Sequence, residues 1–168
     1  YTSIPDQNFK KELKRLGYDR KIDGMVKTNN TKDVTSLRLL LYNEPPKVMS
    51  EIKDLTEIEN FTSLTHLEIN GDHDVGSELA TLDLRKSIAL KELYFDYSYS
   101  GLVEALDLSK IIALEILSYR VSGLKKLYLI QNTLLTDLDC SGNDLKKLDL
   151  SQNTALTELR CNYNNTRD

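Results

Sequence analysis

The side chains with the most distinctive chemistry in this 168-residue chain are two cysteines and two histidines. Cys140 and Cys161 lie 21 residues apart, without the C-x-x-C spacing or the paired histidines of a zinc site. Neither cysteine is placed beside His66 or His73 in a way that would let a histidine activate a thiol. The sequence therefore predicts a protein that is not an enzyme and has no catalytic residues, no metal site and no cofactor.

One acidic loop has part of the pattern of a calcium-binding EF-hand loop. Asp19 and Asp23 occupy its first and fifth positions, and Gly24 occupies the sixth. Lys21 stands at the third position and Asn30 at the twelfth, so a cation replaces one carboxylate and the bidentate glutamate is missing. We therefore expect a turn or small hairpin around Asp23-Gly24 without tight calcium binding.

The elements that must position these side chains are set by a block of 21 residues of the form L-x-x-L-x-C-x-x-N-x-L. The copies begin at Val34, Leu64, Leu90, Leu114, Leu135 and Leu156. The spacing is 21 residues between the last three starts, but it widens to 24 after Leu90 and to 26 after Leu64. The first three coils therefore carry insertions.

Such a block predicts one coil of a leucine-rich repeat. Apolar residues at its first, fourth and sixth positions suit a brief strand, and stacked coils cover one another's apolar rims while their strands pair in parallel. The asparagine at the ninth position can satisfy backbone groups of the turn. The predicted fold class is α/β: a leucine-rich-repeat solenoid over residues 34–168 with a parallel concave β-sheet, in about five to six coils of which the last is incomplete.

Residues 1–33 do not fit the repeat and are predicted to form an N-terminal helical cap over the open end of the solenoid. Pro5 suits the first position of a helix, Phe9 and Leu13 lie on one apolar face, and Gly17 ends it. The basic residues of this helix are interpreted as a solvated face.

Cys140 and Cys161 occupy the sixth position of consecutive coils, which points into the core. Two buried, stacked free thiols are the favoured interpretation because free cysteine behaves as a small hydrophobe. A disulfide across adjacent strands about 4.8 Å apart stays an alternative, although the side chains would have to leave the packing direction.

Composition limits the partners. The net charge is −4, with +3 in residues 1–30 and −7 in the remainder, and an acidic solenoid argues against binding nucleic acid. No apolar run approaches the roughly 20 residues that span a membrane. The chain begins at Tyr1 rather than methionine, so the lack of a leader in it says nothing against export.

Several segments carry a family resemblance: residues 4–9, 19–26 and 52–64, and the Leu-Asp-Cys and Leu-Arg-Cys repeats at 138–140 and 159–161. They resemble bacterial internalin-type leucine-rich-repeat proteins, most of all the cysteine-ladder branch and related secreted proteins. The resemblance implies a recognition module that is extracellular or attached to the cell surface and binds macromolecules, often host proteins.

Alternate residues of each strand should point away from the core and form a binding face on the concave side. The candidate ligand-binding residues are Tyr94, Tyr97, Glu92, Asp96, Ile116, Arg120, Asp139 and Glu68. Tyr94 and Tyr97 are the favoured anchors because tyrosine combines a rigid apolar body with a polar tip. The alternative is that all these residues are only a hydrophilic coat.

We therefore predict binding of a protein partner on this face. A glycan is one alternative, with tyrosines stacking on sugar rings and Glu92, Asp96 or Asn70 binding hydroxyls, and an architectural spacer is another. The strand over Leu156–Cys161 is also predicted to pair with another copy of the chain or a tail, because an uncovered strand edge offers unpaired backbone groups.

Overall fold

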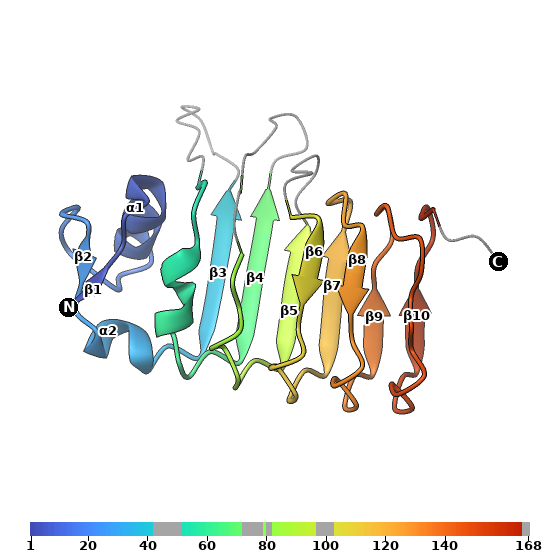
Figure 1. The fold of residues 1–168 in the computed structure, drawn as a ribbon. Helices are drawn as coiled ribbons and strands as arrows, with labels where there is room; N and C mark the ends of the chain where they lie inside the picture. The colour runs from blue at the N-terminus through green and yellow to red at the C-terminus, as the bar shows by residue number, and fades with distance from the viewer. Residues whose placement is uncertain (42–51, 72–78, 80–81, 97–102, 166–168) are drawn as a thin grey trace.

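The computed structural model describes residues 1–41, 52–71, 79, 82–96 and 103–165. Its main feature is a six-stranded parallel sheet whose strands follow one another in chain order (Figure 1). The strands are β3 (Ser36–Leu41), β4 (His66–Gly71), β5 (Glu92–Asp96), β7 (Ile116–Arg120), β9 (Asp137–Asp139) and β10 (Glu158–Arg160). The predicted leucine-rich-repeat solenoid is confirmed.

The register of the sheet is the one that the repeat predicts. A single row of paired residues crosses all six strands, and its members are Leu37, Leu67, Leu93, Leu117, Leu138 and Leu159. The first five are buried, and their stacking forms the centre of the core. Return segments complete the coils: β6 (Ala105–Asp107) pairs in parallel with β8 (Lys126–Tyr128), and η1 (Thr56–Asn60) is a 3-10 helix.

Buried asparagines connect the coils through their side-chain amides. Asn143 donates from Nδ2 to the carbonyls of Tyr119 at 2.6 Å and Cys140 at 3.0 Å, and its Oδ1 accepts from the backbone N–H groups of Ser122 and Leu124. One side chain therefore satisfies backbone groups of two coils in a place that water does not reach. This agrees with the role predicted for the ninth position.

Replacing this amide tests how much the coils depend on it. Asn143→Ala should lower the free energy of unfolding by about 3 kcal/mol, because several buried backbone groups lose their partners. Asn164 makes equivalent contacts with the carbonyls of Cys140 and Cys161 in the last coil but is only half-buried. Asn164→Ala should therefore cost about 1 kcal/mol, and equal losses in urea denaturation would contradict this account.

The N-terminal elements pack against the first coil (Figure 1). Helix α1 (Gln7–Arg15) buries Phe9 and Leu13, and it begins later than Pro5 because Asp6 is its N-cap. Oδ1 of Asp6 accepts from the N–H groups of Asn8 and Phe9, each at 2.8 Å, and Oδ2 accepts from Lys53 N–H at 2.8 Å. One carboxylate thus caps the helix and ties it to the solenoid. The division of the chain at residue 33 stays a prediction.

The acidic loop after α1 turns at Asp23 and Gly24, where Gly24 has a φ of +74°. The strand that follows, β2 (Met25–Val26), pairs antiparallel with β1 (Thr2–Ser3) and not with the residues before the turn. The short helix α2 (Asn29–Lys32) leads into β3. The structure therefore contains the expected turn but not a local hairpin.

Lys10 departs from the prediction of a solvated basic helix face. Its side chain is fully buried, and the ammonium donates to the Asp19 carboxylate and the Met25 carbonyl. It also lies 3.8 Å from Oδ1 of Asp23. The hydrogen bond from Lys10 lowers the pKa of Asp19 below its usual value. A lysine cation therefore stands between the two acidic residues of the calcium-like loop.

The two cysteines are both free thiols, so the disulfide alternative is wrong for this structure. Cys140 is buried as predicted, whereas Cys161 is exposed, and Leu159 beside it is 47% exposed. The physical reason is that no described residue packs on the outer side of β10. That strand forms one edge of the sheet, and its pairing with another chain stays a prediction.

Thiol labelling should separate the two cysteines. Burial raises the pKa of Cys140 to about 12, so at pH 8 this thiol is both neutral and covered. With Ellman's reagent, one thiol should react at once and the other about two orders of magnitude more slowly, after local opening. Cys161→Ser should remove the fast phase. Two thiols that react at one common rate would contradict the burial of Cys140.

A stacked aromatic pair fills the core beneath β5 and β7. The rings of Phe95 and Tyr119 lie 4.4 Å apart between centroids at an interplanar angle of 5°. The Tyr119 hydroxyl is buried and has no hydrogen-bond partner among the described residues, and burial raises its pKa.

Because this hydroxyl has no partner, we expect its removal to stabilise the protein, whereas most substitutions in a core lower the free energy of unfolding. Tyr119→Phe should keep the ring stack, remove a desolvated polar group and raise the free energy of unfolding by about 1 kcal/mol. Tyr119→Leu, which removes the stack, should lower it in the same thermal denaturation assay. A loss of stability in Tyr119→Phe would show that the hydroxyl is bonded in solution.

Candidate functional site

The outward face of the six-stranded sheet collects the polar side chains that alternate with the buried leucines. Two rows of register-paired residues cross it. The first contains Arg38, Glu68, Tyr94, Ser118, Asp139 and Arg160; the second contains Ser36, His66, Glu92, Ile116, Asp137 and Glu158. Residues about one coil apart in the sequence thus become neighbours on the surface.

A compact cluster forms where β4 and β5 meet. His66 Nδ1 lies 3.0 Å from Oε2 of Glu92, and the Tyr94 hydroxyl donates to the same oxygen at 3.3 Å. The rings of His66 and Tyr94 lie 5.3 Å apart between centroids, tilted by 43°. The side chain of Tyr94 is therefore held on two sides. We call His66, Glu68, Glu92 and Tyr94 the central cluster.

Glu68 connects this cluster with β3. Its Oε2 forms an ion pair with Arg38 Nε at 2.8 Å, and its Oε1 accepts from Asn70 Nδ2 at 2.7 Å. Tyr94 is half-buried, and burial, followed by the negative charge of Glu92, raises the pKa of its hydroxyl. The phenol therefore stays neutral and able to donate a hydrogen bond at physiological pH.

The other sequence-predicted residues continue the surface toward the C-terminal coils. Asp96 pairs in register with Arg120, and Arg120 Nε lies 3.7 Å from Oδ2 of Asp139. Oδ1 of Asp96 is buried without a hydrogen-bond partner among the described residues. Ile116 is half-buried beside Glu92. Tyr97 lies outside the described residues, so its position on this face stays a prediction.

The structure therefore brings seven of the eight predicted site residues onto one continuous face. Arg38 and His66 were expected on the outward face but were not among the candidate ligand-binding residues, although they complete the ion-pair and ring contacts of the central cluster. The signal was present in the repeat: His66 and Glu92 are 26 residues apart, which is the length of the coil that joins them. Matching the outward positions between coils would have placed the two together.

The charge of this face is negative. Along the outward positions of the six strands there are six carboxylates and three arginines, which gives −3 with histidine neutral. They are Glu68, Glu92, Asp96, Asp137, Asp139 and Glu158, against Arg38, Arg120 and Arg160.

Within the described residues, no group of three or more His, Cys, Asp or Glu side chains is placed to hold a metal ion, and no helix has the length and apolarity to cross a membrane.

Comparison with solved structures places the fold in a defined class, the leucine-rich-repeat solenoids of internalin type. An internalin of Listeria monocytogenes, InlF, matches 100% of the chain and 48% of its own length, with a TM-score of 0.72 and 16% identity. A leucine-rich-repeat protein of Leptospira interrogans matches 82% of the chain and 39% of its own length, with a TM-score of 0.55 and 20% identity. InlP of Listeria monocytogenes matches 96% of the chain and 52% of its own length, with a TM-score of 0.54 and 18% identity.

The resemblance to internalin-type proteins is thus confirmed at the level of the fold. The chain spans about half the length of the InlF structure that it matches. No protein-family model matches the sequence, and no curated protein matches it either.

Proposed function

We propose that this chain is a non-enzymatic recognition module of a bacterial secreted or cell-surface protein, and that it binds a protein partner on the outward face of its parallel sheet. The internalin-type fold supports a binding role, since repeat solenoids present one extended, regular surface. The resemblance of the sequence to exported proteins of this class supports the extracellular location.

The observation that carries the proposal is the central cluster. The hydrogen bond to Glu92 and the contact with the His66 ring restrict Tyr94 before any partner arrives. A half-buried tyrosine that is already ordered loses little conformational entropy on binding, and tyrosine is enriched among the residues that dominate protein interfaces. A hydrophilic coat would not require this network of interactions.

The charge of the face indicates the kind of protein surface that would fit it. Six carboxylates against three arginines favour a partner whose contact area is basic at its rim. Such complementarity mainly accelerates association and falls with ionic strength. Tyr94 and Ile116 would provide the apolar contacts near the middle, where water is excluded.

Substitution of Tyr94 tests the proposal. Partners captured from host-cell and bacterial surface extracts would be identified by mass spectrometry, purified and measured by interferometry. Tyr94→Ala should weaken binding by about 2 kcal/mol, or roughly thirtyfold in Kd, because an ordered anchor is lost. Tyr128→Ala is the matched control, since Tyr128 is an exposed tyrosine on β8 in the return segments, and should leave Kd unchanged.

Three results would contradict the proposal. Equal weakening by both tyrosine substitutions would place the contact elsewhere. A ligand found on a glycan array, lost in Tyr94→Ala and accompanied by no captured protein, would replace the protein partner with a glycan. The absence of any ligand that depends on Tyr94 would favour the architectural spacer.

A further inference from the structure

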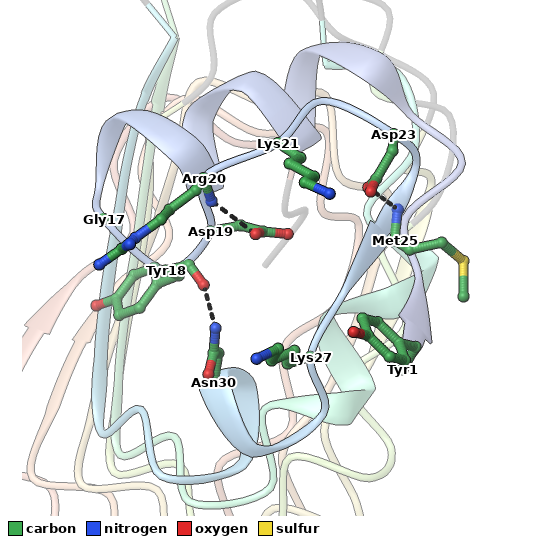
Figure 2. Close-up of a pocket in the computed structure, with 10 residues that line it drawn as sticks. All are labelled: Tyr1, Gly17, Tyr18, Asp19, Arg20, Lys21, Asp23, Met25, Lys27 and Asn30. Atoms are coloured by element: carbon green, nitrogen blue, oxygen red, sulfur yellow. Dashed lines mark hydrogen bonds between the residues drawn. The ribbon is translucent and has the colours of Figure 1, made fainter.

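A second concave region lies in the N-terminal cap. It is a depression of about 850 Å³ that opens between the end of α1, the loop after it and the start of α2 (Figure 2). A smaller depression of about 240 Å³ continues from it and shares Tyr1 and Lys27. The larger volume is in the range of pockets that hold small ligands.

The charges around this depression are unbalanced. Asp19 and Asp23 face the buried Lys10 ammonium, which donates to Asp19 and lies 3.8 Å from Asp23. Arg20, Lys21 and Lys27 make no ion pair with any described residue. The four cations and two carboxylates give the region a net charge of +2, in contrast to the negative face of the sheet.

Two of the unpaired cations, Lys21 and Lys27, line the depression. In Figure 2 Lys21 lies along the upper edge of the open space and Lys27 along its lower edge, so the two side chains border it from opposite sides. The cation that pairs with Asp19 and lies close to Asp23 comes from inside the protein, because Lys10 is fully buried. The exposed lysines are therefore left to bind negative charge from solution.

The remaining lining favours a saccharide over a peptide. Tyr1 lies at the rim and offers a flat apolar ring, whereas Tyr18 lines the depression with its backbone carbonyl, because its ring turns away and its hydroxyl donates to the Ser36 carbonyl at 3.2 Å. The only aliphatic side chain of the lining is that of Met25. Asn30 donates from Nδ2 to the Tyr18 carbonyl at 2.8 Å, which leaves its Oδ1 to accept from a hydroxyl. A peptide would need a deeper apolar recess for an anchor side chain, whereas a sugar uses ring faces and hydroxyl partners.

We propose that this depression binds an acidic saccharide, a sugar chain that carries sulfate or carboxylate groups. Lys21 and Lys27 contact two of its anionic groups, Tyr1 lies against a ring face, and the smaller depression extends the contact along the chain. The site is separate from the sheet face and does not depend on the function proposed for it.

Calorimetry with defined tetrasaccharides tests the inference. The probes are a heparin-derived tetrasaccharide with sulfate and carboxylate groups, tetragalacturonate with carboxylates only, and maltotetraose as the uncharged control. At about 50 mM salt, where surface charges are weakly screened, at least one acidic probe should bind and the neutral probe should not. The two acidic probes distinguish sulfate from carboxylate as the anionic group.

Matched charge removals locate the site. Lys21→Gln combined with Lys27→Gln should weaken binding by about tenfold or more, because two charge-assisted contacts are lost. Lys146→Gln combined with Lys147→Gln removes the same charge from exposed residues of a distant coil and should leave Kd unchanged. Tyr94→Ala should also leave it unchanged, which keeps this test distinct from that of the sheet face. All variants change exposed or half-buried side chains, and circular dichroism checks their folding.

Three outcomes would overturn the proposed saccharide site. Equal losses in the two lysine pairs would show diffuse electrostatic attraction and overturn the site. Failure of both acidic probes to bind, or binding of an acidic phosphopeptide alone, would overturn the assignment to a saccharide.

Discussion

The stacking of one coil on the next is the interaction on which the rest of this structure depends. A single coil cannot bury its leucines, so each contributes roughly 1.5–3 kcal/mol only when a neighbour covers it. The row from Leu37 to Leu138 is buried for this reason. Leu159 and Cys161 occupy the same repeat positions but are exposed, because no described residue covers β10. Burial in this fold is therefore a property of adjacent coils and not of residue type alone.

The stacking of the coils also requires hydrogen-bond partners for the polar backbone groups that it buries. Backbone groups at the turns would be costly to bury without partners, and Asn143 satisfies five of them from one side chain. With the turns fixed, every strand has the same register, and outward residues about one coil apart come into contact. The pairing of His66 with Glu92 arises in this way. The candidate binding face is thus a direct product of the constraint that builds the core.

The N-terminal cap follows different rules. It has no repeat, and it is attached to the solenoid by particular contacts, such as those of Asp6 with Asn8, Phe9 and Lys53. The buried ammonium of Lys10 neutralises a loop whose sequence resembles a calcium site, and the exposed lysines around it face solvent. The two surface regions therefore differ in charge: the outward face of the sheet is negative, and the depression in the N-terminal cap is positive.

The sequence by itself determined the solenoid, the register of its strands and which alternate residues face outward, because a periodic spacing transmits one local pattern to every coil. It also indicated the coil-spanning asparagines and the burial of Cys140. Only the tertiary structure decided that Lys10 is buried, that β2 pairs with β1 and that Cys161 is exposed. These features depend on contacts between segments that do not repeat, or on whether a neighbouring coil is present. A spacing pattern carries no information about either.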